Sequence, residues 1–475
     1  MIRYGVALGG VICAALQWAV PASATASALD AFLQSDYKAA FTQYQALAKS
    51  GAPNAQAMVG VMLQDGIGAD ASVEGATAAF EDAAKAGNAV AENGLGYMYD
   101  KGRGVGIDFD RSFKLYQSAA QKGFARAQFN LGVMYDLGRG VSKDHSQAFK
   151  WYLAAARHGY VPAQNSVGGM YALGEGVQKD PKQAAYWFGQ AASAGRDALA
   201  LGNLGALYAL GTGVDKSPER ALDFYHKAVA AKDANAEFNL GLMYLKGDGL
   251  PKDVTQAVKA FEKAAAGGNE RARAVMGLLY ATGFGVGKVN LMKAVTLLLT
   301  AANNADQAES RTCGIKTQAD IDTQNRLAQD NNPRALYCVG VAYAQGIEGL
   351  LAPDPAQSSM LLGAAANLGD PGAQYRMGVA AMQKAANPWD SQLAIQWFLA
   401  SALGKRLDDV PSTVDATQRF LDESEPSISF SLVTTASSAH DLLPGQILLA
   451  SPGELGQMKV KAASVKTTKG APAAS

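Results

Sequence analysis

The chain has few of the residues from which catalytic, metal and disulfide sites are usually built. Its 475 residues include three cysteines and four histidines, and no H-x-x-x-H or C-x-x-C spacing occurs among them. Basic and acidic residues are balanced at 42 each, so the sequence lacks the basic excess of proteins that bind nucleic acids or anionic membranes. Phosphate-loop and nucleophile-elbow motifs are also missing. We therefore predict no catalytic residue, no metal site, no cofactor and no nucleic-acid partner.

A long apolar segment is missing too, except near the start of the chain. Residues 6–20 form an apolar run that follows Arg3 and precedes the small residues PASATASA. This order predicts a signal peptide over residues 1–28, because a charged start, an apolar run and Ala-x-Ala cleavage sites characterise secretory signals. The run is shorter than the ~20 residues of a membrane-spanning helix. We therefore expect a mature chain without a stable membrane span, exported across the inner membrane into the periplasm.

Two cysteines, Cys313 and Cys338, remain after removal of that segment. An exported chain meets an oxidising compartment, where a single pair of thiols is expected to form a disulfide. The two residues stand 25 positions apart, and closing a loop of that size stabilises a fold by ~3 kcal/mol. The alternative is a pair of unpaired buried thiols.

A repeat of about 36 residues dominates the rest of the chain. The segment AQFNLGVMYDLGRGV, which begins at Ala127, returns almost unchanged as AEFNLGLMYLKGDGL, which begins at Ala236. One glycine of this motif marks each copy and recurs at Gly60, Gly96, Gly132, Gly168, Gly205, Gly241, Gly277, Gly340 and Gly378. Successive copies are 36 or 37 residues apart up to Gly277, and the next two steps are 63 and 38 residues. A period of this length is typical of an array of helical hairpins.

Each copy also contains the signals of a second helix. A residue that can cap a helix N-terminus stands at Asp36, Ser72, Asp108, Asp144, Asp180, Ser217, Asp253, Asn290, Asp354 and Asp390. Eight residues after each cap lies a large apolar residue, and glycine pairs such as Gly138 and Gly140 permit a tight turn before most caps. We therefore predict that each copy forms a helix A, a glycine turn and a helix B. Neighbouring copies must stack, because one hairpin cannot bury its own apolar face.

The motif A-x-x-x-L-G-x-M-Y, followed by G-x-G-V and a capped helix, resembles the Sel1-like repeat family, whose members are related to tetratricopeptide repeat proteins. The resemblance covers about residues 36–405. It implies an all-α fold, a right-handed α/α superhelical solenoid of helix pairs. It also implies a non-catalytic scaffold or adaptor that binds another protein of the cell envelope through the solenoid groove. The corresponding settings are exopolysaccharide production, signalling and envelope assembly.

The limits of the pattern divide the chain into six segments. They are a signal peptide (1–28), N-terminal capping helices (29–51), a first run of repeats (52–302), an inserted loop (303–333), further repeats (334–406) and a largely disordered C-terminal extension (407–475). The insert accounts for the 63-residue step, and insertions in solenoids project from one face, often the binding face. Both the insert and the extension are candidates for a binding element. The alternative is a decoration without a partner for the insert and a solvated tail for the extension.

Candidate partner-binding residues share one position of helix A. Asn130, Asn203 and Asn239 occupy it in three copies, and Arg376 occupies it in the last copy. In the related tetratricopeptide repeats, asparagines near this position face the groove and hydrogen-bond the backbone of a ligand. The resemblance implies the same role here, and the alternative is that these amides lie inside the stack.

A second function from a different class stays open. Some cysteine-rich relatives of this family are associated with binding penicillin-like molecules. The alternative is therefore a peptidoglycan- or β-lactam-binding protein with weak hydrolase activity. Those relatives carry a cysteine pair in each unit, and this chain does not.

Overall fold

The computed structural model describes residues 22–193, 197–311, 313–385, 387, 391–411, 414–424 and 426. Most of the predicted signal peptide and most of the predicted disordered extension lie outside the described residues. Contacts divide the chain into two compact units. The N-terminal unit includes Met1–Gly195, and the C-terminal unit is Arg196–Ser429.

Nine helix A segments are described, and each carries the marker glycine near its middle. They are α4 (Pro53–Asp65), α6 (Ala89–Lys101), α8 (Ala125–Leu137), α10 (Val161–Leu173), α12 (Ala198–Leu210), α14 (Ala234–Lys246), α16 (Glu270–Thr282), α19 (Pro333–Gln345) and α21 (Pro371–Lys384). The helix B that follows each is α5 (Val73–Lys85), α7 (Phe109–Gln121), α9 (His145–Arg157), α11 (Pro181–Ser193), α13 (Pro218–Ala230), α15 (Val254–Ala266), α17 (Leu291–Arg311), α20 (Pro355–Asn367) and α22 (Gln392–Leu403).

Four further helical elements lie outside these pairs, together with one short turn of helix. Helices α2 (Ala22–Leu33) and α3 (Tyr37–Lys49) precede the first pair, and α18 (Gln318–Gln329) lies between α17 and α19. After α22 come the 3₁₀ turn η2 (Leu407–Asp409) and α23 (Val414–Glu423). Helix α2 begins inside the predicted signal segment, and its Ala28 is fully buried in a cluster with Tyr44 and Met58.

The helix starts follow the predicted caps. Nine of the ten predicted residues accept a hydrogen bond from a backbone N–H in the first turn, as Asp108 does from Arg111 at 2.9 Å. Such a bond satisfies one of the donors that a helix N-terminus leaves without a partner. The tenth residue, Asp390, lies outside the described residues, and Ser391 caps α22 instead.

The marker glycine of helix A lies directly against the large apolar residue of helix B. A Cβ added at Gly132 would stand 2.6 Å from the Tyr152 ring, and one added at Gly241 would stand 2.6 Å from the Phe261 ring. The two sequence signals are therefore one packing unit, in which the absence of a side chain on helix A makes room for a ring on helix B. This close contact fixes the register of each helix pair.

The second glycine of the inter-helix turn has a similar steric reason. Gly140 has a φ of 64°, and a Cβ at this position would lie 2.3 Å from the backbone oxygen of Phe109. The turn thus passes directly over the start of the preceding helix B, and any side chain would prevent this approach.

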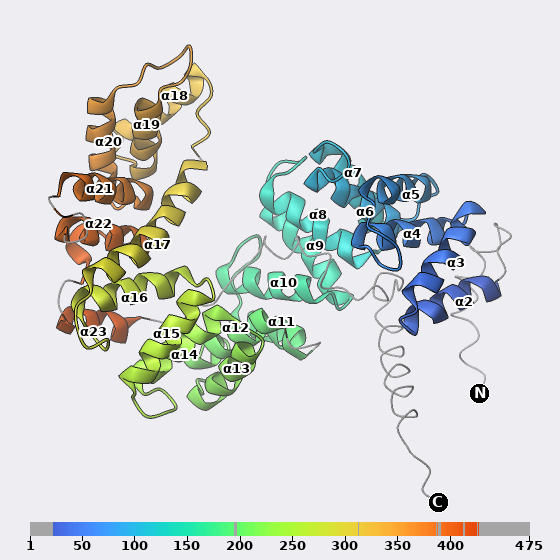
Figure 1. The fold of residues 1–475 in the computed structure, drawn as a ribbon, viewed down its shortest axis with the longest axis horizontal. Helices are drawn as coiled ribbons and strands as arrows, with labels where there is room; N and C mark the ends of the chain where they lie inside the picture. The colour runs from blue at the N-terminus through green and yellow to red at the C-terminus, as the bar shows by residue number, and fades with distance from the viewer. Residues whose placement is uncertain are drawn as a thin grey trace, which may run out of the picture. The chain divides into compact units, whose positions relative to one another are not determined.

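The N-terminal unit confirms the predicted architecture of stacked helix pairs. From α2 to α11, each helix packs against the helix before it and the helix after it in the sequence (Figure 1). The described residues of the chain contain no β-strand, only an isolated bridge between Ile347 and Leu351. The fold is therefore an all-α solenoid of helix pairs. Among the described residues, no helix combines the length and the apolar character that a membrane crossing requires.

The C-terminal unit departs from simple stacking. Helices α12 to α17 pack in sequence order, but α17 then packs against α21 and α22. Among the described residues, α18 packs mainly against α19. The pair α21–α22 therefore lies between the pair α16–α17 and the pair α19–α20, as the yellow, brown and red helices of Figure 1 show. The eighth repeat occupies the far end, and the ninth returns to fill the gap.

The predicted inserted loop at 303–333 is largely helical, which corrects that expectation. Its first part extends α17 to 21 residues, and its second part forms α18. The extension of α17 runs past α22 to α21, which is how the chain reaches the far end of the unit before it turns back. The extra length of this repeat suggested a projecting loop, but the segment is helical, and Thr317 and Asp320 form a capping box at the start of α18.

Candidate protein-binding surface

The helix A segments of the N-terminal unit present a surface of polar and aromatic side chains, most of which are half-buried. We call this surface the N-terminal A face and define it by Gln64 and Asp65 of α4, Asn93 and Tyr97 of α6, and Arg126 and Asn130 of α8. All but Asn130 line a small hollow of about 30 Å³ between the three helices, together with Val90. Among the described residues, α4, α6 and α8 pack mainly against the helices next to them in the stack.

Hydrogen bonds between side chains hold this face in shape. Asn130 donates its Nδ2–H to Oδ1 of Asn93 at 2.9 Å, which joins α8 to α6. Gln64 donates its Nε2–H to Oδ1 of Asp65 at 3.2 Å. Arg126 and Tyr97 stay half-buried beside them. Arginine and tyrosine are enriched where protein interfaces are strongest, because each combines a large contact area with a polar end.

Ion pairs with shielded carboxylates hold neighbouring helices of the N-terminal unit together. Glu92 of α6 is 6% exposed and accepts hydrogen bonds from Lys122 Nζ at 2.6 Å and from Ser118 Oγ at 2.9 Å, both on helix α7 or its C-cap. Asp100 pairs with Arg139 at 3.3 Å in the next repeat. A buried carboxylate is tolerated only when such partners satisfy it. The Glu92 contacts join the two helices of one repeat, and the Asp100–Arg139 pair joins successive repeats.

The predicted asparagine ladder is only partly directed toward solvent. Asn130 is half-buried and belongs to the A face, whereas Asn203 and Asn239 are each 1% exposed. In this conformation the latter two cannot reach a ligand, so their placement favours the alternative of a role inside the stack.

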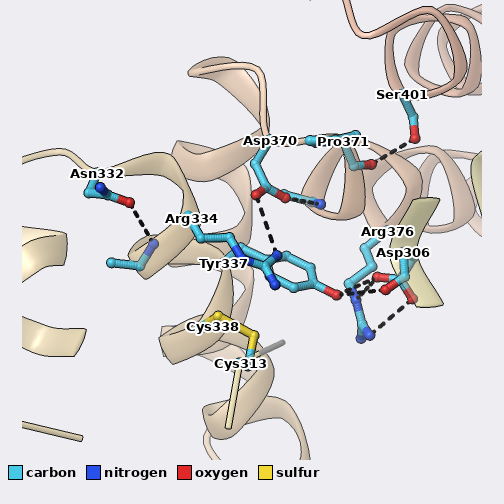
Figure 2. A network of polar contacts seen from close by, with 12 residues as sticks. Asp306, Cys313, Asn332, Arg334, Tyr337, Cys338, Asp370, Pro371, Arg376 and Ser401 are labelled. Atoms are coloured by element: carbon cyan, nitrogen blue, oxygen red, sulfur yellow. Dashed lines mark hydrogen bonds and ion pairs between the residues drawn. A yellow bond between two sulfur atoms is a disulfide. The ribbon is translucent and has the colours of Figure 1, made fainter. Parts of the chain in front are cut away.

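Arg376 lies in a polar cluster that joins three helices of the C-terminal unit (Figure 2). Its Nε donates to Oδ1 of Asp306 on α17 at 2.8 Å, and its second nitrogen donates to Oδ2 at 3.2 Å. Tyr337 of α19 donates its O–H to the same Oδ1 at 2.7 Å. Asp306 is 8% exposed, and this carboxylate therefore needs both donors. The arrangement clamps the extended end of α17 onto α19 and α21.

The protonation of this cluster follows from its burial. Burial raises the pKa of Tyr337, and the bond to Asp306 raises it further, so the phenol stays protonated and continues to donate. Burial alone would lower the pKa of Arg376, but the Asp306 carboxylate outweighs it and holds the pKa above the ordinary value. The cluster is thus a stable ion pair with a neutral donor. Arg376 is engaged in structure rather than offered to a partner.

Cys313 and Cys338 form the predicted disulfide, with Cα atoms 5.3 Å apart. The bond ties the segment after α17 to α19, next to the Asp306 cluster (Figure 2). Cys338 is 2% exposed, and Cys313 packs in the same hydrophobic cluster with Leu336 and Val341. Cross-link and clamp together fix the far end of the C-terminal unit.

Sequence reasoning missed several residues that shape these surfaces. Asn93 was overlooked because it stands one position before the asparagine position of the other copies. Asp306 was placed in a loop, although the repeating apolar residues of α17 continue the helical pattern toward it. Among the described residues, no group of three or more His, Cys, Asp or Glu side chains is placed to hold a metal ion.

Comparison with known proteins supports the repeat assignment. The model of the Sel1 repeat matches nine segments, at residues 53–88, 89–124, 125–160, 161–195, 198–233, 234–269, 271–306, 333–370 and 371–404. A Sel1 repeat protein from Oxalobacter formigenes is 34% identical, covering 51% of this chain and 95% of its own, with a TM-score of 0.49. A protective antigen of uropathogenic Escherichia coli strains, which displays an SLR fold, is 24% identical, covering 92% and 98%, with a TM-score of 0.45. No curated protein matches the chain.

Proposed function

The chain belongs to the Sel1 repeat family, and from this premise we propose that it is a non-catalytic scaffold that binds a protein partner through the N-terminal A face. Sel1 repeats generally mediate protein–protein interaction. The observation that carries the proposal is the A face itself, where half-buried Tyr97 and Arg126 line a hollow between three helices and the Asn93–Asn130 hydrogen bond joins two of these helices. Such a surface offers donors, acceptors and an aromatic ring on a rigid support.

The partner is a protein of the bacterial cell envelope, and the scaffold works in the periplasm. Two features support this location. The first 28 residues have the pattern of a secretory signal. The Cys313–Cys338 disulfide is of the kind that persists in an oxidising compartment. Exopolysaccharide production, signalling and envelope assembly are the settings in which such a scaffold is expected.

Affinity purification of the full-length protein from its native cells tests the binding face. Arg126→Glu reverses a charge on the A face. The control variant, Lys150→Glu, reverses a charge on the exposed side of α9, a helix B segment. We expect a partner that co-purifies with wild type and with Lys150→Glu but not with Arg126→Glu. Equal recovery with both variants would show that the A face is not the binding surface.

Sedimentation with purified sacculi separates this proposal from peptidoglycan binding. A scaffold that binds only proteins should stay in the supernatant, both as the wild type and as the Arg126→Glu variant. Co-sedimentation of the purified protein, together with turnover of a cell-wall substrate, would contradict the non-catalytic scaffold.

A further inference from the structure

Helix α23 lies on the helix A side of the C-terminal unit, against helices that are distant from it in the sequence. It packs against α14 and α16, two helix A segments of earlier repeats, rather than against the end of the last repeat alone. Among the described residues between α22 and α23, one element is present, the short turn η2. Figure 1 shows α23 beside α16. In this unit, a helix that follows the repeats therefore covers a helix A face. The corresponding face of the N-terminal unit carries polar residues that are mostly half-buried.

The contacts of α23 are those of an amphipathic helix in an apolar groove. Leu421 and Thr417 are fully buried, and Leu421 belongs to a hydrophobic cluster with Leu242 and Leu245 of α14 and Met276 of α16. The opposite side of the helix carries exposed Arg419, Asp422 and Glu423. Helix recognition in grooves commonly uses buried residues spaced in this way.

Electrostatic contacts complete the docking. Lys246 at the end of α14 donates its Nζ–H to the backbone oxygen of Ser424 at 2.6 Å, directly after the C-terminus of α23. A cation is favourable at this end of a helix because the last carbonyl groups lack partners. Lys405 lies 5.8 Å from the centre of the Phe420 ring. The groove thus offers apolar side chains in its floor and Lys246 at its edge.

The floor of this groove differs from the N-terminal A face at one position of helix A. Leu245 of α14 is 1% exposed, whereas the same position holds Gln64, Asp100 and Asp136 in the first three helix A segments. Leu245 packs in the hydrophobic cluster that also contains Leu421 of α23. This position of α14 therefore contributes an apolar side chain to the floor of the groove.

We propose that the face formed by α14 and α16 is a helix-binding site that the chain itself closes with α23. Its external ligand is an amphipathic helix of a protein partner, with paired large apolar residues on one side and acidic residues on the other. Helix α23 has ten residues, and isolated helices of this length are marginally stable in water. It therefore acts as a tethered, displaceable ligand. This site is separate from the N-terminal A face and goes beyond the proposed function.

A labelled peptide tests the site in the full-length protein. The probe is a fluorescein-labelled peptide of residues 411–426, followed by fluorescence anisotropy. Leu421→Asp in the protein places a charge in the apolar floor and releases α23, and Arg419→Asp makes the same change on the exposed side. We expect saturable binding to Leu421→Asp and at least tenfold weaker binding to wild type and to Arg419→Asp. A peptide that itself carries Leu421→Asp should not bind.

Further measurements make the result decisive. Thr417→Asp provides a second releasing variant, circular dichroism checks that the repeats stay folded, and hydrogen exchange in residues 415–423 reports release of α23. Equal binding to wild type and to the releasing variants would show that α23 does not close the site. No binding to a folded variant whose α23 amides exchange freely would show that the face does not accept helices. Neither outcome affects the test of Arg126→Glu on the N-terminal A face.

Discussion

At the scale of single residues, the fold depends on glycines that make room for rings. Gly132 stands against Tyr152, and equivalent pairs link Gly168 with Phe188 and Gly205 with Tyr225. In an ordinary helix, alanine is more favourable than glycine by about 1 kcal/mol. Here the steric contact outweighs that preference, because an added methyl group would overlap a ring that is itself fully buried.

We predict that Gly132→Ala lowers the free energy of unfolding by about 1–3 kcal/mol, the usual effect of overpacking a core. Gly189→Ala in α11 is the matched control, since a Cβ there meets nothing within 4 Å. That change should stabilise by about 0.5–1 kcal/mol through helix propensity alone. Urea unfolding followed by circular dichroism measures both. A stabilising effect at Gly132 would refute the ring-and-glycine explanation of the repeat.

A helix cap gives a prediction about pH. Asp233 accepts hydrogen bonds from the backbone N–H groups of Asn235 and Ala236, yet burial raises its pKa above the ordinary value and outweighs these bonds. A carboxylate with a raised pKa in the folded state stabilises that state at low pH, and this contribution is lost as the pH rises through the folded pKa. Asparagine caps a helix equally well and carries no charge.

The variant Asp233→Asn should therefore gain stability relative to wild type as the pH increases from about 3.5 to 7. Thermal unfolding of both proteins at several pH values measures the difference between their midpoints. Asp320→Asn is the opposite control, because hydrogen bonds hold the pKa of this exposed carboxyl below its usual value. Its relative stability should fall over the same range. A pH-independent difference for Asp233→Asn would contradict the burial argument.

At the scale of elements, the long helix α17 is the part that changes the course of the chain. Its extension carries Asp306 to Tyr337 and Arg376, which are 31 and 70 residues away in the sequence. Helices α19 and α21 are thereby held to α17, and the disulfide holds the next segment to α19. The return of the last repeat rests on these contacts.

We predict that Arg376→Met lowers the free energy of unfolding by about 3–5 kcal/mol, because it leaves the Asp306 carboxylate buried without its charged partner. The double variant Asp306→Asn/Arg376→Met should be more stable than this single variant, since it removes the charge and keeps an acceptor for Tyr337. Chemical unfolding of the three proteins provides the comparison. A double variant less stable than Arg376→Met would show that the buried carboxylate is not the source of the loss.

The local parts of these elements could be predicted from the sequence, and the long-range parts could not. Caps such as Asp108 and the glycine period specified where each helix begins and which two helices pair, since these signals act within about 36 residues. The helical state of residues 303–311 and 318–329 was missed, because the insert was recognised from the extra length of the repeat and insertions in solenoids commonly project as loops. The position of α23 on α14 was missed for a related reason. A helical pattern identifies a buried side but not its distant partner.

At the scale of the whole molecule, the two units treat their helix A faces differently. In the C-terminal unit, α23 covers α14 and α16, and the end of α17 lies against α21 and Tyr337 of α19. In the N-terminal unit, among the described residues, α4, α6 and α8 pack mainly against neighbouring helices of the repeats. This difference is why we assign partner binding to the N-terminal A face.

Site-specific photo-crosslinking in the native cell tests that assignment most directly. A benzophenone amino acid replaces Tyr97 on the A face. In the control protein it replaces Tyr186 of α11, a helix B segment, where the tyrosine is 54% exposed. The account predicts one discrete protein adduct from position 97, its loss when Arg126→Glu is added, and no equivalent adduct from position 186. An adduct that forms equally from both positions, or that persists with Arg126→Glu, would contradict it.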